Sequence, residues 1–184
     1  MKKMLVFLGS PRKDGNTEKM ALAFAEGARE GHADVDYVRL GEKAIKPCID
    51  CRKCWENGRH CILEDDMEAL YTAIDDADVL VFAAPLYWYT WSTQIKALWD
   101  RLLPYASDKA SRNLRGKGCV LLAAGGDVAS DVFEGMDFAL DKSAALLGME
   151  ILGRVHASGV HGPEDIEGTD RLEEARRLGR ECTR

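Results

Sequence analysis

Apolar residues recur along the chain in short runs that are bounded by residues typical of turns. Such runs are characteristic of buried strands, because a strand that is covered on both faces carries few polar side chains. We therefore expect five β-strands, at residues 4–8, 35–40, 79–84, 119–124 and 151–158.

The segments between these runs carry apolar residues at helical spacing. The clearest is 93–103, in which Ile95, Leu98 and Leu102 share one face opposite Lys96, as in an amphipathic helix. Similar patterns predict helices at residues 17–30, 64–74 and 131–147, and a last helix, charged and expected at the surface, at 170–182.

The alternation of strands and helices predicts a parallel sheet. Right-handed crossovers between parallel strands place helices on both faces of the sheet, so we expect a three-layer α/β fold. In such folds ligands bind beyond the carboxyl ends of the strands, where the winding direction reverses. The loops that follow three of the predicted strands are therefore the candidate site, at residues 9–17, 85–93 and 123–131.

Length and composition fit a globular protein. The 184 residues suit a single domain over residues 1–184, with 46% hydrophobic and 30% charged residues. The net charge of −6 argues against binding to nucleic acid or anionic membranes. The first apolar run is too short for a signal peptide, and no run approaches the roughly 20 residues of a membrane-spanning helix. We expect a soluble, cytoplasmic protein with no nucleic-acid or membrane partner.

The first candidate loop, GSPRKDGNT, has the chemistry of a phosphate site. A helix start offers free N–H groups and a positive dipole end. Ser10, Asn16 and Thr17 can add side-chain donors, and Arg12 or Lys13 can balance the charge. Neither a Walker A loop nor a G-x-G-x-x-G loop fits the spacing, which disfavours ATP and a Rossmann-bound NAD. The alternative is a plain turn in which Asn16 or Thr17 only caps the helix.

Four of the six cysteines are concentrated in a pattern C-x2-C-x2-C-x6-C, at Cys48, Cys51, Cys54 and Cys61. In a reducing cytoplasm such a group is more typical of metal binding or redox chemistry than of disulfides. The segment is too compact for the two separated ligand pairs of common zinc sites, whereas C-x2-C-x2-C suits a loop around a four-iron cluster. A redox pair of Cys48 and Cys51 is a third alternative.

The remaining cysteines and the histidines carry no recognisable motif. Cys119 lies in a predicted strand and is expected to be a small buried apolar residue, and Cys182 is assigned no role. The histidines are scattered and are expected at the surface or in loops: His32, His60, His156 and His161.

Several motifs together resemble a known family. Gly9-Ser-Pro-Arg12 followed by Gly15-Asn-Thr17 resembles the FMN-phosphate loop of the flavodoxin-like NADPH-dependent FMN reductases, a family that includes the iron-sulfur flavoproteins. The resemblance extends over most of the chain, through the cysteine segment and Asp65-Asp66-Met67, Ala84-Pro-Leu-Tyr87, Lys96 with Asp100-Arg101, and Gly125-Gly-Asp127. It implies a flavodoxin-like fold, a five-stranded parallel sheet of order 2-1-3-4-5, and a cysteine-rich insert at about residues 45–63.

The same resemblance implies an FMN site built from the three loops. The phosphate is then held by Ser10, Arg12, Asn16 and Thr17. The flavin ring then lies between Pro85, Leu86, Tyr87 and Trp88 on one side and Gly125, Gly126 and Asp127 on the other. Aromatic side chains of the middle loop can stack on a flavin, but they can equally fill a core or a subunit interface.

The cysteine segment resembles the motif that holds a four-iron (4Fe-4S) cluster beside FMN in iron-sulfur flavoproteins, and all four cysteine positions are filled. Related reductases keep cysteines in this loop without a cluster, so both alternatives stay open.

Three hypotheses for the function follow. The first is an FMN-dependent oxidoreductase that takes a hydride from NAD(P)H and reduces a small-molecule acceptor, with no acid, base or nucleophile supplied by the protein. The second is an iron-sulfur flavoprotein electron carrier that exchanges electrons with ferredoxin-like partners through FMN and the cluster. The third is a flavodoxin-like binding module without a flavin. The aromatic loop favours a homodimer or homotetramer.

Overall fold

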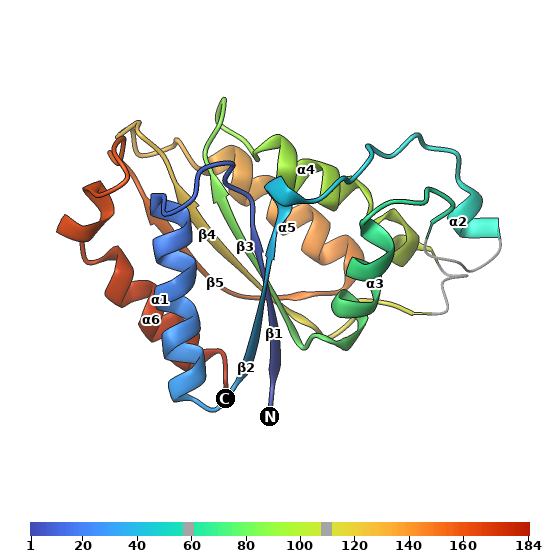
Figure 1. Cartoon of the computed structure of the whole chain (residues 1–184), viewed down its shortest axis with the longest axis horizontal. Helices are drawn as coiled ribbons and strands as arrows, with labels where there is room; N and C mark the ends of the chain where they lie inside the picture. The colour runs from blue at the N-terminus through green and yellow to red at the C-terminus, as the bar shows by residue number, and fades with distance from the viewer. Residues whose placement is uncertain (57–60, 108–111) are drawn as a thin grey trace.

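The computed structural model describes residues 1–56, 61–107 and 112–184, and within them a parallel sheet of five strands forms the centre of the molecule (Figure 1). The neighbouring strands are all parallel, in the order β2-β1-β3-β4-β5. The predicted strands and the flavodoxin-like order are confirmed, and each strand begins and ends within one residue of its predicted bounds. The strands are β1 (Lys3–Leu8), β2 (Asp34–Arg39), β3 (Val79–Pro85), β4 (Gly118–Ala124) and β5 (Glu150–Ala157).

Helices cover both faces of this sheet (Figure 1). One face carries α1 (Asn16–Glu30) and α6 (Arg171–Glu181), and the other carries α3 (Met67–Asp76), α4 (Thr93–Asp100) and α5 (Glu134–Leu147). The predicted three-layer α/β architecture is therefore confirmed. The shorter elements are α2 (Lys53–Glu56) and the 3-10 turns η1 (Leu40–Glu42), η2 (Leu103–Ala106) and η3 (Asp165–Gly168).

Three helices differ in length from their sequence patterns. Helix α5 begins at Glu134 rather than at residue 131, because residues 131–133 form a turn. Helix α3 begins at Met67 rather than at residue 64, because the Asp65 carboxylate lies outside the helix and accepts the Met67 N–H at 3.0 Å. Helix α4 ends at Asp100 rather than at residue 103. The chain there turns into η2, which contains Pro104, a residue without the N–H that an α-helix needs.

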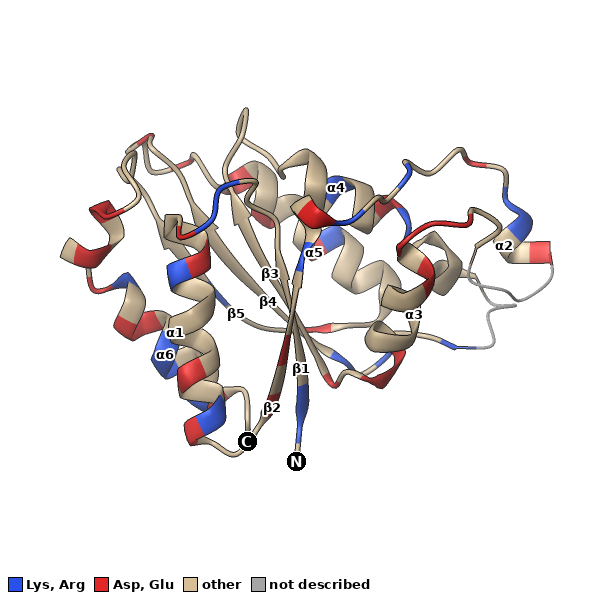
Figure 2. Ribbon diagram, viewed as in Figure 1, with Lys and Arg blue, Asp and Glu red and all other residues tan. Residues whose placement is uncertain are grey.

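The sheet separates two hydrophobic cores, because alternate side chains of a strand point to opposite faces. Phe7 and Phe82 lie in the core beneath α3, α4 and α5, whereas Val6 and Val81 lie in the core beneath α1 and α6. Figure 2 shows charged residues on the outer surfaces of the helices and on the edge strand β2, whereas β3 and β4 carry none.

Helix α6 is more than a charged surface element, because it packs tightly against α1. A Cβ atom at Gly27 would lie 1.8 Å from the Arg176 carbonyl oxygen, and one at Gly179 would lie 2.0 Å from the Phe24 carbonyl oxygen. Only glycine permits this approach of the two backbones. Just beyond the helix, Cys182 is buried, and burial raises the pKa of its thiol to about 11. The expected surface position thus holds only for the outer face of α6.

Residues 45–56, which carry three of the four clustered cysteines, extend away from the sheet beside α3 (Figure 1). They are held against the rest of the protein by Trp55, whose indole Nε1 donates a hydrogen bond to the Leu103 carbonyl at 3.0 Å.

None of the helices in the described ranges has the length and apolar character that crossing a bilayer requires.

Candidate functional site

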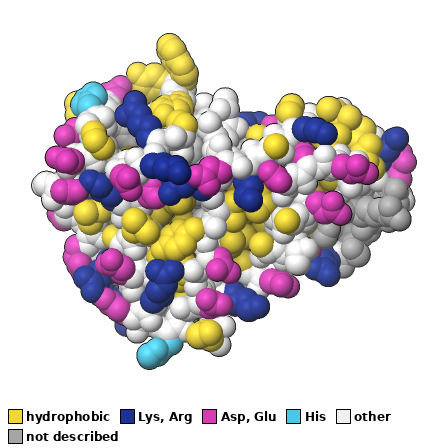
Figure 3. Space-filling view, in the orientation of Figure 1, with side chains coloured by type: hydrophobic (Ala, Val, Ile, Leu, Met, Phe, Trp, Pro, Cys, Tyr) yellow, Lys and Arg dark blue, Asp and Glu magenta, His cyan; other side chains and the backbone are white. Residues whose placement is uncertain are grey.

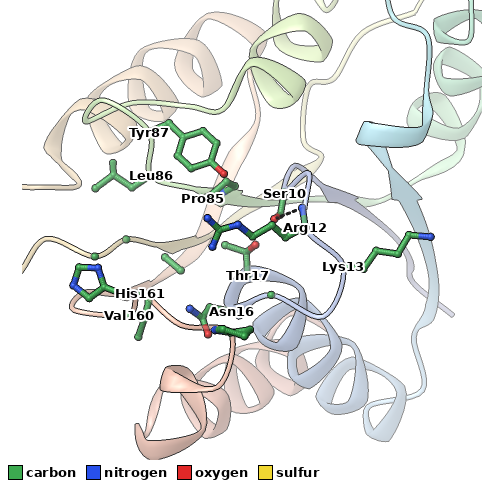
Figure 4. A pocket seen from close by; sticks show the side chains of 15 residues that line it. Ser10, Arg12, Lys13, Asn16, Thr17, Pro85, Leu86, Tyr87, Val160 and His161 are labelled. Carbon is green, nitrogen blue, oxygen red and sulfur yellow. Dashed lines mark hydrogen bonds between the residues drawn. The ribbon is translucent and has the colours of Figure 1, made fainter.

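A cavity of about 470 Å³ lies at the carboxyl ends of the strands (Figure 4). Its walls come from the loops that follow β1, β3 and β4, and from residues 160–163 after β5. The volume is within the roughly 300–1,000 Å³ of small-molecule sites. The three loops that the sequence singled out therefore meet at one place, and a fourth loop completes it.

The start of α1 faces this cavity without a side-chain cap. Gly15 is the N-cap residue and has no side chain to accept a hydrogen bond from the first helical turn, so that turn can donate to a ligand. Ser10 and Thr17 are buried beside the helix start, and the Ser10 Oγ accepts the Arg12 N–H at 3.1 Å. An uncapped helix start with two adjoining hydroxyls is a typical phosphate-binding arrangement.

Asn16 connects the helix start to the loop after β5. Its Nδ2 donates to the Gly162 carbonyl at 2.9 Å, while its Oδ1 is buried and has no hydrogen-bond partner in the described part of the chain. A buried acceptor without a partner is costly and uncommon, which indicates that a ligand donor belongs at this position.

Two cations of the first loop differ in their surroundings. The Lys13 ammonium lies 3.0 Å from the Glu42 carboxylate, and in Figure 4 it points away from the cavity. The Arg12 side chain points into the cavity in the same view. Between Arg12 and Lys13, Arg12 is therefore the better placed to balance a bound anion.

The acidic residue in the first turn of α1 is neutralised. Glu18 is buried and accepts hydrogen bonds from Arg39 and from the Asp14 backbone. The Arg39 hydrogen bond outweighs burial and holds the pKa of Glu18 below its ordinary value. Because the carboxylate is paired with a guanidinium, it does not repel an anion at the helix start.

The opposite end of the cavity is lined by apolar and small residues. Pro85, Leu86 and Tyr87 line one wall, and Gly125 and Gly126 line the other. A Cβ at Gly125 would lie 2.9 Å from the Leu86 side chain, and one at Gly126 would lie 2.5 Å from the imidazole of the loop after β5. The two glycines thus leave room for the Leu86 side chain and the His161 ring, which larger residues would displace.

A tight hairpin adjoins this wall. Tyr87 and Thr90 exchange two backbone hydrogen bonds of 3.1 Å, and Trp88 and Tyr89 between them have φ angles of +50° and +59°. Left-handed conformations are costly for bulky residues and cluster at functional sites. The Tyr89 hydroxyl donates to Asp127 Oδ2 at 3.2 Å, which joins the hairpin to the loop after β4.

Nine of the eleven residues predicted to hold FMN line the cavity, and two do not. Trp88 is 93% exposed at the hairpin tip, and Asp127 is engaged with Tyr89 and with the Ala129 N–H. The nine that line the cavity are Ser10, Arg12, Asn16, Thr17, Pro85, Leu86, Tyr87, Gly125 and Gly126. Their combination of phosphate donors and apolar walls fits the two ends of FMN.

The expected surface or loop position is confirmed for His32 and His161 and is wrong for His156. His161 lines the cavity beside Gly126 (Figure 4). His156 lies in β5 rather than in a loop, and its ring stacks on Phe133 at 4.5 Å. Burial lowers the pKa of His156, and Asp137 at 3.2 Å opposes this shift. Isolated histidines give no sequence signal for such positions, because strand pairing and loop packing place them. His60 lies outside the described residues.

The four clustered cysteines line a second, apolar cavity, together with Tyr71 and Arg101. Cys54 is buried, and burial together with the neighbouring thiols raises its pKa. The Cys61 Sγ accepts the Leu63 N–H at 3.5 Å. Cys119, as expected, is a buried strand residue, with a pKa that burial raises to about 12.

The thiols of this second cavity have the donor chemistry of a four-iron cluster. Across residues 1–56, 61–107 and 112–184, no three His, Cys, Asp or Glu side chains converge as ligands of one metal ion. A four-iron cluster instead takes each thiolate on a separate iron, so its ligands stand further apart. The donor set, four thiols in an apolar lining, suits this group. The free space is about 20 Å³, so the loop must widen to hold it.

The fold and the cavity define a flavodoxin-like α/β protein with a site for a phosphate-bearing planar ligand. The profile of the NADPH-dependent FMN reductase family matches residues 2–157. The chain therefore belongs to this family.

Relatives of the chain include iron-sulfur flavoproteins. One from Methanocaldococcus jannaschii is 30% identical over 183 residues, which cover 97% of this chain and 94% of the relative. Another, from Archaeoglobus fulgidus, is 32% identical over 124 residues, which cover 67% of this chain and 56% of the relative. The matched part thus spans little more than half the length of the second relative.

A solved structure with the same fold is the NAD(P)H:quinone oxidoreductase from Methanothermobacter marburgensis. It superposes with a TM-score of 0.74 and covers 97% of this chain and 94% of that chain, at 21% sequence identity. The similarity confirms the fold.

Proposed function

We propose that this chain is an FMN-dependent oxidoreductase that accepts a hydride from NAD(P)H and passes the electrons to a small-molecule acceptor of the quinone or nitro type. The observation that carries the proposal is the cavity at the carboxyl ends of the strands, which joins an uncapped helix start to an apolar wall. Membership of the NADPH-dependent FMN reductase family supports the same activity.

The FMN phosphate is assigned to the start of α1. Ser10, Asn16 and Thr17 donate hydrogen bonds to it, together with the first N–H groups of the helix, and Arg12 balances its charge. The unpartnered Asn16 Oδ1 accepts a hydrogen bond from a hydroxyl of the flavin side chain. The ring lies against residues 85–87 and residues 125–126, and Trp88 and Asp127 act outside the cavity.

A bound flavin supplies the hydride chemistry, and the protein binds the ring, orients it and sets its environment. We assign no acid, base or nucleophile to the chain. NAD(P)H binds transiently at the mouth of the same cavity, because hydride transfer requires the two reacting rings to be in contact.

Binding of FMN to the purified chain tests the proposal directly. A ligand at 100 times its dissociation constant adds roughly 2.7 kcal/mol of stability, which corresponds to a rise in melting temperature of about 5–11 °C for a chain of this size. NADPH should then bleach the flavin absorbance under anaerobic conditions. A colourless protein that FMN does not stabilise would overturn the assignment of the cavity to flavin.

Alanine substitutions locate the phosphate. We expect Asn16→Ala and Thr17→Ala to weaken FMN binding by at least roughly tenfold each, or about 1.4 kcal/mol, measured by quenching of flavin fluorescence. Asn113→Ala and Thr72→Ala are matched controls, because both residues are exposed and neither lines the cavity. Equal affinities in all four variants would mean that the phosphate binds elsewhere.

The cysteine cavity favours an alternative form of this function, in which the chain is an iron-sulfur flavoprotein. Four thiols line one apolar cavity, and the M. jannaschii relative that aligns over most of the chain is named an iron-sulfur flavoprotein. Cys48, Cys51, Cys54 and Cys61 are then the ligands of a 4Fe-4S cluster that exchanges electrons with FMN and with a ferredoxin-like partner.

Chemical analysis separates the two forms. Anaerobic purification followed by iron and acid-labile sulfide assays should give about four irons and four sulfides per chain if the cluster is present. A preparation that binds FMN but stays well below this iron and sulfide content, even after incubation with ferrous iron and sulfide, would show that the protein is a reductase without a cluster.

We further propose that the protein works as a homodimer or homotetramer in the cytoplasm. The hairpin after β3 projects from the molecule, and Figure 3 shows hydrophobic side chains on this projection. Trp88 and Tyr89 are exposed on it, and Val128 is exposed nearby, a grouping typical of subunit contacts. The six cysteines are free thiols, which suits a reducing compartment. A monomer in light scattering would exclude the oligomer.

A further inference from the structure

Arg101 is the largest of the fully buried side chains and belongs to no element of the proposed flavin site. It follows α4, is 1% exposed, and lines the cavity that the four cysteines surround. A buried guanidinium is rare unless other groups compensate its charge and its five N–H donors.

The guanidinium joins the two ends of the cysteine segment. Its Nη1 donates to the Lys46 carbonyl at 2.8 Å and to Asp65 Oδ2 at 2.7 Å, and its Nη2 donates to Asp65 Oδ1 at 3.2 Å. Asp65 in turn accepts the Lys46 N–H at 2.9 Å. Lys46 precedes Cys48, and Asp65 follows Cys61. One arginine therefore holds the two ends of the cysteine segment at a fixed distance from each other.

One nitrogen of the Arg101 side chain, the buried Nε, makes no hydrogen bond to any residue in the described ranges. Burial opposes the charged form, but the hydrogen bond with Asp65 and the neighbouring Tyr71 raise the pKa of Arg101 above its ordinary value. The side chain is therefore a permanent cation with a free N–H at a cavity lined by thiols.

We propose that Arg101 is the positioning residue of the thiolate site: it holds the cysteine loop at both ends, and its free Nε–H and positive charge stabilise the sulfur ligands of a bound cluster. This inference rests on the iron-sulfur form of the proposed function. Adding one electron to a cluster held by four thiolates adds one negative charge, so a fixed cation beside it favours the reduced state. Hydrogen bonds to sulfur and local charge are the usual determinants of such potentials.

Reduction potentials of the reconstituted protein test this role. The full-length chain is loaded anaerobically with ferrous iron and sulfide, reduced stepwise with dithionite, and followed by EPR at low temperature. Because a single substitution would strand the buried Asp65 carboxylate, the main variant is Arg101→Gln with Asp65→Asn, which removes both charges and keeps the shapes. We expect its cluster to be at least tenfold harder to reduce, a fall of 59 mV for a one-electron couple.

Two further variants distinguish a specific role from a general structural one. Arg101→Lys keeps the charge without the planar donor set, and its cluster potential should lie between those of the wild type and the double variant. Arg112→Gln with Asp75→Asn removes another arginine–aspartate pair, with an N–O distance of 2.6 Å, that does not line the cysteine cavity. This control should leave the cluster potential unchanged, and the FMN potential should be the same in every variant.

The outcomes are separable. If the double variant holds less iron but its clusters titrate at the wild-type potential, Arg101 is only a structural tie and the inference fails, while the iron-sulfur form stands. If the wild type takes up no iron and sulfide, the inference and the iron-sulfur form fail together. FMN binding, measured in the same samples, then remains an independent test of the proposed oxidoreductase function.

Discussion

Replacing Asp65 by asparagine removes the counter-charge of a guanidinium that is almost fully buried. The side chains of Asp65 and Arg101 are 2% and 1% exposed, and they are joined by hydrogen bonds of 2.7 and 3.2 Å. Removal of one partner of a buried pair costs about 3–5 kcal/mol. In a domain of this size each kcal/mol lowers the melting temperature by about 2–4 °C, so we expect a loss of about 6–20 °C.

The pH dependence of this loss follows from the pKa of Asp65. Burial raises that pKa, but hydrogen bonds from Arg101 and from the backbones of Lys46 and Met67 outweigh burial and lower it. A carboxyl group of this kind stabilises the fold fully above its unfolded pKa, and this stabilisation is lost as the pH falls through the folded pKa. The difference between wild type and Asp65→Asn should be constant near neutrality and shrink below about pH 4.

Urea denaturation of the metal-free, reduced protein measures both effects. Asp100→Asn is the matched control, because the Lys96–Asp100 pair is exposed and should contribute less than about 1 kcal/mol. The double variant Arg101→Gln with Asp65→Asn should cost less than the sum of the two single variants, since neither group is left unpaired. The reasoning is refuted if Asp65→Asn costs no more than Asp100→Asn, or if its cost persists undiminished in acid.

Three further variants follow from close contacts and backbone geometry. Gly126→Ala places a methyl group 2.5 Å from the His161 ring, so the dissociation constant for FMN should rise roughly tenfold, or about 1.4 kcal/mol. Gly179→Ala places one 2.0 Å from the Phe24 carbonyl oxygen and should lower the free energy of unfolding by about 1–3 kcal/mol without changing FMN affinity. Trp88→Asn with Tyr89→Gly gives the left-handed hairpin its preferred residues and should stabilise the monomer by about 1 kcal/mol or more.

For each of these variants, one result would contradict the contact or backbone conformation on which the expectation rests. Unchanged FMN affinity in Gly126→Ala would show that the flavin ring does not lie beside Gly126. Gly168→Ala is the control for the helix contact, because nothing lies within 4 Å of its Cβ position; equal stability of this variant and Gly179→Ala would contradict the tight α1–α6 contact. A loss of stability in the hairpin variant would show that its aromatic side chains, rather than strain, dominate there.

The local sequence pattern was sufficient to predict much of the fold of this protein. The length and apolarity of the strand runs determine a buried parallel sheet, and the helical spacing between them determines the layers, because both depend on residues that are neighbours in the sequence. The chemistry of Ser10, Asn16 and Thr17 at a helix start predicts a phosphate site, which stays a prediction. The elements could be predicted, including the ends of the strands to within one residue.

Only the tertiary structure decided which groups meet. Asn16 bonds to Gly162, 146 residues further along the chain, and this contact brings His161 to the cavity although nothing near His161 in the sequence marks it. Arg101 reaches Lys46 and Asp65, 55 and 36 positions away, and so ties a cysteine loop whose own spacing says nothing of an arginine. Such contacts depend on strand order and on helix crossings, which bring together residues with no periodic relation in the sequence. The sequence by itself determined the elements and the kinds of chemistry, and the fold determined their partners.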